Sequence, residues 1–496
     1  MAVKNQNKKI LFGLKVKQLR REQALSFAEL SARAGLSVSY LNEIEKGKKF
    51  PKPDKIKALA AALDVSASEL TSRDFDERLS PVVDLLKSNF LNELPLDLFG
   101  IELNKVVEII ASAPARVGAF ISTLLELSRN YALREENFYF SALRSYLELH
   151  NNYFPELEEA VDDFQNRYHI PADRPLPANL LGGLLESAFG YTLVEDGLEC
   201  YPELRSLRSV YLPQEKKLLL NSSLNELQRS FQFGKELGFQ FLGLKERAYT
   251  SSILRSRVFE EVLNHSKSIY FSVALHLPLN AINQDVATFF QRPSWDGDAW
   301  LELTRKYVVT PEMFYHRLTN ILPQFFGIKK LFFFRFSHDL TTDQFDIDKE
   351  LHLNHNHRPH GNGLDEHYCR RWVSISLLHD LRERQRQDED VDHIVRAQIT
   401  SYIGSDDQYL CLTIARPAYP RPEKNVSVTI GLLINEELRQ KIRFVEDPAI
   451  QRADVHTTCE RCPIVDCQVR AASPVILEKR RRVHEIEGRL QQLIHS

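Results

Sequence analysis

Hydrophobic positions near the N-terminus recur with the spacing of short amphipathic helices. Apolar residues at positions 11, 12, 14, 16 and 19 form one helical stripe, and Lys and Arg occupy its other side. Ser26 and Glu29 then have the S-x-x-E spacing of a helix capping box. Gly35 follows as the residue that ends this helix in a tight turn. The pattern therefore predicts two short helices at the start of the chain.

A third and a fourth helix are expected directly afterwards. Ser37 can cap a helix that Gly47 closes, and Pro53 stands near the start of the next one. Leu41 and Ile44 are expected to face the core of the bundle. Two short helices joined by a Gly-containing turn inside a small bundle describe a helix-turn-helix.

The middle of the chain changes pattern after a polar, turn-rich stretch at residues 71–81. Residues 82–165 have recurring leucine pairs and few glycines, which favours helices. Two short strands are expected at LRSVYL and KKLLLN. Apolar positions 233, 237 and 241 recur every four residues and predict a helix with one buried face.

The last third of the chain is rich in predicted strands. Five apolar segments separated by polar loops predict an antiparallel sheet with helices on one side, as in sensor domains of the PAS or GAF kind. The segments are KKLFFFRF, CRRWVSISLL, HIVRAQITSYI, QYLCLTIARP and NVSVTIGLLI. The terminal run LEKRRRVHEIEGRLQQLI predicts an amphipathic helix that docks or dimerises. The expected fold class is multidomain, mainly α with α+β parts.

Composition narrows the class of protein. The chain has 496 residues, of which 43% are hydrophobic and 26% charged, and this suits two to four ordinary globular domains. No apolar run is long enough to span a bilayer and no signal peptide is evident, so we expect a cytoplasmic protein with reduced thiols. The net charge is −3, yet residues 1–60 hold 14 Lys and Arg against 5 Asp and Glu. A basic domain on an acidic body is expected when that domain meets a polyanion.

The segment GLSVSYLNEIEKGKKFPKPDKIKALAAAL resembles the lambda-repressor-like (XRE) family, and the resemblance covers residues 8–72. It implies that the third helix is the recognition helix and lies over the major groove of DNA. The residues expected at the DNA are Ser37, Val38, Ser39, Tyr40 and Asn42 near the bases, and Lys46, Lys48 and Lys49 on phosphates. A protein-binding four-helix bundle is the alternative.

Residues 229–243 and the segment KSIYFSVALHLP resemble parts of the IrrE/ImmA-like metallopeptidase domain. In the H-E-x-x-H motif two His bind zinc and the Glu acts as base. Here Lys235 and Phe239 occupy the two His positions, and only Glu236 remains. Where that family supplies a third, acidic ligand, this chain has SKS at residues 266–268. We therefore expect a scaffold or a ligand pocket and no enzyme.

Three of the six cysteines lie within nine positions, in TTCERCPIVDCQVRAA. Cys459, Cys462 and Cys467 have the spacing C-x2-C-x4-C, which in a cytoplasmic protein indicates metal or cofactor ligation. A tetrahedral metal needs a fourth ligand, from His456, an acidic side chain or a distant cysteine, for which Cys369 is the best candidate. The spacing leaves both zinc and an iron–sulfur cluster open.

The order of these parts resembles the short-chain fatty acyl regulators (ScfR family), which include regulators of propionate, methylcitrate and glyoxylate metabolism. The resemblance covers essentially the full chain and includes the C-terminal CxxCPxxxC pattern with AA-x-P after it. It implies a C-terminal domain that senses acyl-coenzyme A (acyl-CoA) thioesters. It also implies a 4Fe–4S cluster held by Cys459, Cys462, Cys467 and the remote Cys369, with zinc as the alternative.

Two weaker signals lie near the remote cysteine. Family members often have Cys-Pro-Leu-Trp where this chain has Cys369, Arg370, Arg371 and Trp372. The two Arg can bind the phosphates of coenzyme A in a bidentate way, or they can simply be exposed or ion-paired. Five His between positions 352 and 367 are compatible with a second metal site, but a solvated loop fits their spacing better.

These observations predict a DNA-binding transcriptional regulator controlled by a short-chain acyl-CoA. It is expected to act as a homodimer on half-sites roughly 34 Å apart, with the effector between the IrrE-like scaffold and the C-terminal sheet. The expected parts are residues 8–72, which bind DNA; 75–285, helical and IrrE-like; 290–475, which bind ligand and metal; and 476–496, a helix. The alternative is a regulator whose C-terminal part only oligomerises around a structural zinc.

Overall fold

The computed structural model divides the chain into two compact units. One consists of Met1–Tyr146 with Arg255–Phe259, and the other of Leu147–Leu254 with Glu260–Ser496. The residues that the structure describes are 2–71, 135–171, 174–251, 256, 258–353, 366–387, 389–419, 421 and 423–495. The helical pattern expected between residues 82 and 134 lies outside them.

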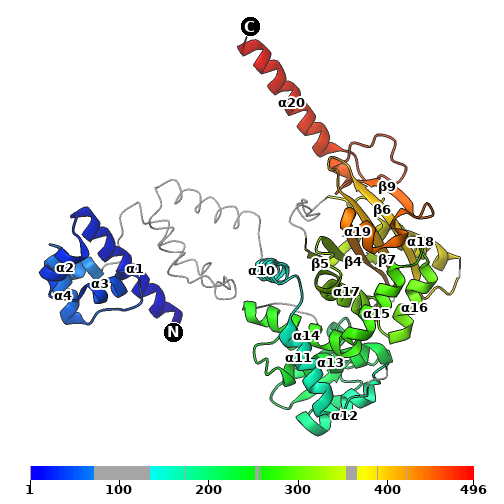
Figure 1. Ribbon diagram of the computed structural model, residues 1–496, viewed down its shortest axis with the longest axis horizontal. Coiled ribbons are helices and arrows are strands. Elements are labelled where there is room, and N and C mark those ends of the chain that lie inside the picture. The colour runs from blue at the N-terminus through cyan, green and yellow to red at the C-terminus, as the bar shows by residue number, and fades with distance from the viewer. Residues whose placement is uncertain are drawn as a thin grey trace. The chain divides into compact units, whose positions relative to one another are not determined.

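The first unit contains the predicted bundle, drawn in blue in Figure 1. Its described helices are α1 (Ala2–Glu22), α2 (Phe27–Ala34), α3 (Val38–Glu45), α4 (Pro53–Ala62), α5 (Ala67–Thr71) and α10 (Glu135–Leu149), which runs to its boundary. Ser26 and Glu29 form the predicted reciprocal capping box, and Gly35 ends α2 in a left-handed conformation. Leu41 and Ile44 of α3 are fully buried, which confirms the predicted core face.

The N-terminal half of the second unit consists of helices and a small three-stranded sheet. It contains α11 (Pro155–Arg167), α12 (Ala178–Phe189), α13 (Glu226–Phe241), α14 (Phe259–His276) and the 3-10 helix η2 (Pro202–Leu204). The strands β1 (Thr192–Val194), β3 (Lys217–Leu220) and β2 (Ser209–Leu212) pair in that order. The strands predicted at LRSVYL and KKLLLN are therefore confirmed.

A six-stranded sheet forms the C-terminal half, with the order β5-β4-β8-β7-β6-β9. Its strands are β4 (Leu331–Asp339), β5 (Phe345–His352), β6 (Ile394–Tyr402), β7 (Gln408–Pro417), β8 (Lys424–Leu433) and β9 (Gln451–Val455). The β6–β9 pair is parallel and the others are antiparallel.

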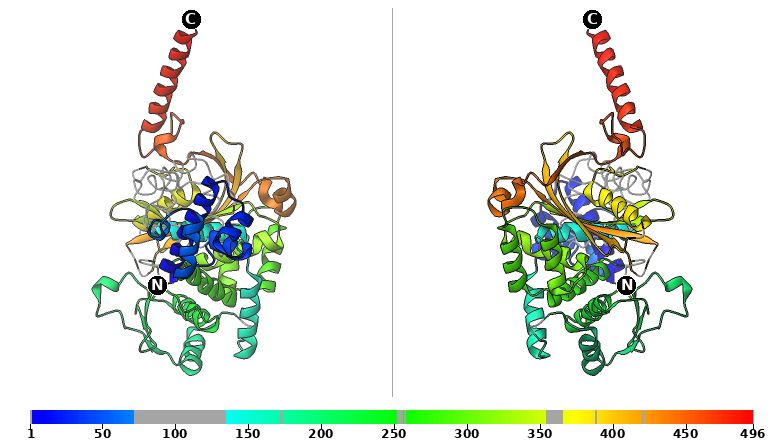
Figure 2. Two further views of the ribbon diagram at one scale, coloured as in Figure 1. Left: turned by 90° about the vertical axis from the view of Figure 1, so that its left-hand side faces the viewer. Right: turned by 90° about the vertical axis from the view of Figure 1, so that its right-hand side faces the viewer.

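Helices cover both faces of this sheet (Figures 1 and 2). Leu331 and Phe333 of β4 share one core with α15 (Leu279–Phe290), α16 (Gly297–Tyr307) and α17 (Pro311–Phe325). Phe332, Phe334 and Phe336 point to the opposite face and pack with α18 (Val373–Arg386). The remaining elements are α19 (Glu436–Lys441), η3 (Arg443–Glu446), η4 (Cys459–Arg461) and α20 (Val475–Ile494). The expectation of helices on one side of the sheet was therefore wrong.

The strand predicted at CRRWVSISLL is also wrong, because this segment begins helix α18. The letters W-V-S-I-S-L alternate as in a strand, but the apolar positions then continue at Leu377, Leu378 and Leu381 with helical spacing. These residues are buried against the sheet, while His379 and Asp380 between them are only half-buried. In a strand, the polar residues that follow would alternate between the two faces of the sheet and could not all face the solvent.

Among the residues that the structure describes, no helix is both long and apolar enough to cross a bilayer.

Candidate DNA interface and cysteine site

The N-terminal half of α3 carries the residues predicted to read DNA. Ser37 caps the helix, since its hydroxyl oxygen accepts the Tyr40 amide N–H at 3.2 Å. Val38 is 45% exposed although it is apolar, and Ser39 beside it is exposed as well. Tyr40 and Asn42 are half-buried. The start of α3 therefore offers short polar and apolar groups to a partner, while its other face is fixed in the core.

An ion pair that the sequence analysis missed fastens this helix to α1. The Arg20 guanidinium donates to both carboxylate oxygens of Glu45, at 2.6 and 2.8 Å, and to the Leu25 carbonyl at 2.9 Å. It also stacks over the Phe27 ring, 4.2 Å from its centroid. Glu45 is buried at the end of α3. A Glu in a hydrophilic stretch gives no local sign that it is buried, because its partner is remote in the sequence.

The three lysines predicted on phosphates, Lys46, Lys48 and Lys49, are all exposed at the C-terminal end of α3 and in the turn after it. Lys49 forms an ion pair with Glu43 at 2.8 Å and lies 5.9 Å from the centroid of the Tyr40 ring. The hydrogen bond and charge of Glu43 raise the pKa of Lys49. A phosphate at Lys49 would therefore compete with Glu43.

Comparisons with known proteins match this part of the chain. The helix-turn-helix domain family matches residues 11–72. The uncharacterised HTH-type transcriptional regulator y4dJ of Sinorhizobium fredii (strain NBRC 101917 / NGR234) is 40% identical over 62 residues, which are 80% of that protein and 12% of this chain. This chain belongs to the helix-turn-helix transcriptional regulators.

A solved structure resembles a larger part of this regulator. It is titled a Mycobacterium tuberculosis transcriptional regulator, and the match covers 67% of this chain and 93% of that one. The sequence identity is 18% and the TM-score 0.46. With that TM-score, the likeness supports no argument about fold or function.

The cysteine site of the regulator is assembled by two segments far apart in the sequence. The Cys369 amide N–H donates to the Thr457 carbonyl at 3.2 Å, and the Cys459 amide N–H donates to the His367 carbonyl at 2.9 Å. Residues 367–369 therefore pair with residues 457–459 as a short antiparallel bridge. The bridge brings the remote cysteine beside the clustered ones.

Polar side chains clamp the same two segments together. Glu366 accepts two hydrogen bonds from the Arg461 guanidinium, at 2.7 and 2.5 Å, and a third from the Thr458 hydroxyl at 2.7 Å. In return, the buried Glu460 carboxylate accepts the His367 backbone N–H and contacts its Nδ1 at 2.8 Å. Sequence reasoning did not name Glu366, Thr458, Glu460 or Arg461 as part of the site, because none of them has a metal-ligand spacing.

Arg470 closes the loop that carries the clustered cysteines. Its guanidinium donates to the carbonyls of Cys459 at 2.9 Å and Cys462 at 3.3 Å, and also to the Ile464 carbonyl. The Ala471 amide N–H points at the Cys459 Sγ at 3.4 Å. Such a hydrogen bond to sulfur is a common outer contact of thiolate ligands.

The four predicted ligands are thiols, which is the donor type that zinc and iron–sulfur clusters take. Cys369, Cys459 and Cys462 are buried and Cys467 is half-buried. Burial, together with the two nearest thiols, raises the pKa of Cys369 to about 11, so this thiol ionises near neutral pH only when a positive charge offsets burial. Among the described residues, no three Cys, His, Asp or Glu side chains are already arranged to hold a metal ion, and the ligand role stays a prediction.

The three residues after Cys369 have different surroundings. Trp372 is buried in the sheet core and stacks on Phe334, with 6.0 Å between ring centroids. The Arg370 guanidinium lies over the Phe345 ring at 4.1 Å, and burial lowers its pKa. Arg371 is half-buried. Trp372 therefore has a packing role in the structure, and binding of a ligand by these three residues stays untested.

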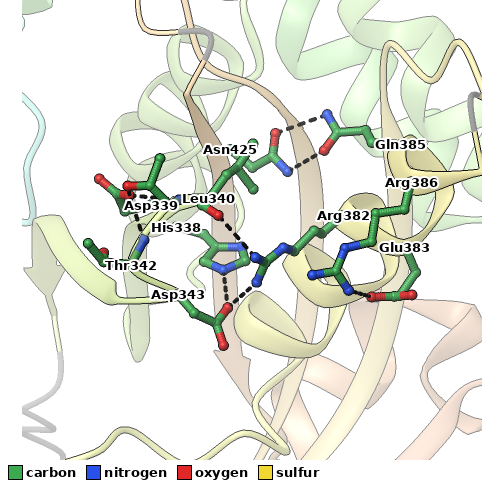
Figure 3. Close-up of polar contacts among 11 residues, drawn as sticks. His338, Asp339, Leu340, Thr342, Asp343, Arg382, Glu383, Gln385, Arg386 and Asn425 are labelled. Carbon is green, nitrogen blue, oxygen red and sulfur yellow. Dashed lines mark hydrogen bonds and ion pairs between the residues drawn. The ribbon is translucent and has the colours of Figure 1, made fainter.

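A polar network surrounds the other side of Phe345. The His338 ring stacks on Phe345 with 4.1 Å between centroids, and its Nε2 lies 2.7 Å from Asp343 (Figure 3). Arg382 of α18 donates to the same carboxylate and to the Leu340 carbonyl. These contacts tie the β4–β5 turn to α18.

The helix that resembles a metallopeptidase helix carries an ion pair in place of metal ligands. Glu236 of α13 accepts two hydrogen bonds from Arg247, both at 2.7 Å, and lies 3.2 Å from the Tyr191 hydroxyl. The Arg247 guanidinium stacks over Phe239 at 3.8 Å. Lys235 is buried and its Nζ donates to the Ser251 carbonyl at 3.1 Å. The IrrE-like origin of this part stays a prediction.

Proposed function

We propose that this regulator binds DNA as a homodimer and is controlled by a short-chain acyl-CoA held in the second unit. In this proposal Cys369, Cys459, Cys462 and Cys467 hold a 4Fe–4S cluster, with zinc as the alternative. The observation that supports the effector is an excess of positive charge, buried in part, between the two halves of that unit.

Five cationic side chains, which we call the cation cluster, come from five different elements or their ends. They are Arg208 before β2, Lys235 on α13, Arg335 on β4, Lys349 on β5 and Arg416 on β7. Arg335 pairs directly with Lys349 across β4 and β5, so both side chains leave the same face of the sheet. Arg416 shares that face, because Leu412 and Ile414 of the same strand pack with α17 there.

Two carboxylates only partly balance this charge. Glu312, in the first turn of α17, accepts a hydrogen bond from Arg416 at 2.6 Å and lies 3.5 Å from Arg335. Arg335 also pairs with Asp348. Burial alone would raise the pKa of Glu312, but Arg416 and Arg335 hold it well below its usual range. Five cations against two anions leave a net positive charge in this group.

The pKa values of both lysines in the cluster are lowered, chiefly by burial and further by neighbouring cations. Burial, together with Arg335 and Arg208, lowers the pKa of Lys349 to about 8. Burial also lowers the pKa of Lys235 to about 7. The neighbouring Glu236 opposes this shift, whereas Arg247, Lys349 and Arg208 add to it. Lys349 is nevertheless exposed to water, so a ligand can reach its side chain. A bound anion would relieve the repulsion and restore both ammonium charges.

Coenzyme A matches the charge and the placement of the cluster. It carries a diphosphate and a 3′-phosphate, and Arg binds phosphate through two parallel hydrogen bonds. Arg208 and Lys235 belong to the half that resembles the IrrE-like scaffold, and the other three belong to the sheet. A ligand that spans them would contact both halves at once. It controls DNA binding only if it binds two conformations of the regulator with different affinity.

The test compares ligands with and without phosphates on the full-length protein. Calorimetry should show binding of propionyl-CoA and none of propionyl-pantetheine, which has the same acyl chain but no phosphate. Lys349→Gln should weaken the binding about tenfold, as expected for one charged hydrogen bond to phosphate. Lys329→Gln, an exposed lysine before β4, serves as the control.

Two results would count against the effector. Equal affinity of the Lys349→Gln and Lys329→Gln proteins would exclude the cation cluster as the site. Absence of any binding across a series of acyl-CoA thioesters would favour the alternative, in which the C-terminal part only oligomerises.

The cysteine site has a separate test. Anaerobic purification should give a brown protein with iron and sulfide in equal amounts, and Cys369→Ser should lose both. A colourless protein with zinc would make the site a structural one and remove redox chemistry from the proposal.

A further inference from the structure

Helix α20 carries an apolar stripe that no other described element covers. None of its residues is buried, and in Figures 1 and 2 it projects beyond the β9 end of the sheet. Val483, Ile486, Leu490 and Leu493 are 48%, 54%, 50% and 66% exposed. Only the first turn, around Ile476, is half-buried. Large apolar side chains exposed in a row mark a surface that is covered by a partner.

The spacing of the stripe identifies the kind of partner. Positions 483, 486, 490 and 493 alternate steps of three and four, which is the a and d pattern of a heptad repeat. In the heptad before Val483, Ile476 takes the a position and Lys479 takes the d position. Such a narrow seam fits another helix of the same pattern, whereas a helix on a globular core has a wider apolar face.

The flanking charges favour one orientation. In this register Arg482 and Arg489 take g positions, and Glu487 takes an e position. In a parallel pair, each g residue faces the e residue of the next heptad on the partner, so Arg482 meets Glu487 twice. In an antiparallel pair, g residues face each other, which places Arg482 against Arg489. The e residues then also face each other, which places Arg480, at the first e position, against Glu487. The parallel pair therefore has only attractive charge contacts, whereas the antiparallel pair combines attractive and repulsive ones.

We propose that α20 forms a parallel two-stranded coiled coil with α20 of a second copy of this chain. The interface is symmetric and therefore closes at two copies. The inference rests on the homodimer of the proposed function and assigns it an interface, independently of the effector and of the cysteines. A seam of fewer than three heptads is short, so the association is expected to be reversible.

Charge reversal on the full-length protein tests both the seam and its orientation. Arg482→Glu and Glu487→Arg each place like charges across the interface and should weaken the dimer about tenfold in sedimentation equilibrium. The double variant restores opposite charges and should return the dissociation constant to within about twofold of the original. Arg481→Glu, at the outward f position, makes the same charge change and should have no effect.

An apolar variant tests the seam without a change of charge. Leu490→Ser should shift the chain to a monomer, while Gln491→Ser, one position further on, should not. A wild-type dimer that Arg482→Glu and Leu490→Ser leave intact would overturn this interface but keep the homodimer. A wild-type chain that stays monomeric at tens of micromolar would overturn both this interface and the homodimer. Binding of wild type to phosphatidylserine vesicles, abolished by Leu490→Ser without loss of the dimer, would assign the stripe to a membrane surface and overturn the inference.

Discussion

Arg20 of α1 and Glu45 of α3 form a bidentate ion pair, with hydrogen bonds of 2.6 and 2.8 Å, that is almost closed to water. The pair connects the first helix of the DNA-binding domain to the end of its recognition helix. Because both groups are enclosed, removal of one leaves the other as an uncompensated charge. The orientation of α3 therefore depends on Arg20, which belongs to another helix.

Loss of this pair is expected to unfold the first unit more easily. Glu45→Gln should lower the free energy of unfolding of the domain by about 3 kcal/mol, because it leaves the Arg20 charge buried without its partner. The measurement is hydrogen exchange of the buried amides of α3. Glu43→Gln breaks the exposed pair with Lys49 and should change the same free energy by less than about 1 kcal/mol. Equal effects of the two variants would contradict the prediction.

Gly13 is expected to be irreplaceable where α1 crosses α3. A Cβ at this position would lie 2.2 Å from the Ile44 carbonyl oxygen, which belongs to the backbone and cannot move aside. Gly13→Ala should destabilise the first unit by about 2 kcal/mol or more, measured by the same exchange. Gly183→Ala in α12 of the second unit is the control, read by exchange of the amides of α12 itself. It should not destabilise that helix, because nothing lies within 4 Å of the added Cβ and Ala favours the helix.

Substitutions of base-contacting and of phosphate-contacting residues along α3 should affect DNA binding in different ways. Asn42→Ala should reduce the preference for the operator over random DNA by roughly tenfold, because one base contact contributes about 1–3 kcal/mol. Lys48→Gln should weaken both kinds of DNA alike and lower the salt dependence of binding by about one unit of slope. The measurement is fluorescence anisotropy on a selected operator over a series of salt concentrations. A change of specificity in Lys48→Gln would contradict this division.

The affinity for acyl-CoA is expected to fall as the pH rises above about 8. Burial, with Arg335 and Arg208, places the pKa of Lys349 near 8 in the free protein. A bound phosphate favours the ammonium form and raises that pKa, so binding takes up a proton above pH 8. The contribution of Lys349 is complete below pH 8 and is lost as the pH rises toward the pKa of the bound state. Calorimetry in two buffers of different ionisation enthalpy measures the proton uptake. Lys349→Gln should abolish the part of this uptake that Lys349 contributes.

The clamp around the cysteines should control access to Cys369. Glu366→Ala removes the acceptor for Arg461 and Thr458, and the short bridge at residues 367–369 should then open. The expected result is alkylation of Cys369 in the metal-free protein at least about tenfold faster, read by mass spectrometry of the labelled peptide. Glu478→Ala, an exposed residue of α20, should leave the rate unchanged. An unchanged rate in Glu366→Ala would show that the bridge persists without the clamp.

Local signals in the sequence determined the DNA-binding domain. Ser26 with Glu29, and Ser37 at the start of α3, satisfy helix ends through hydrogen bonds to residues three positions away. Gly35 supplies the turn, and the apolar spacing places Leu41 and Ile44 in the core. These interactions span a few residues, so their pattern is visible in the letters alone.

Only the tertiary structure decided which distant groups meet. The Arg20–Glu45 pair, the bridge between Cys369 and residues 457–459, and the cation cluster each combine elements that are remote in the chain. Alternation at W-V-S-I-S-L was equally compatible with a strand, and the packing of Leu377 and its neighbours against the sheet made it a helix. Long-range contacts have no fixed spacing, and burial against a partner outweighs local preference.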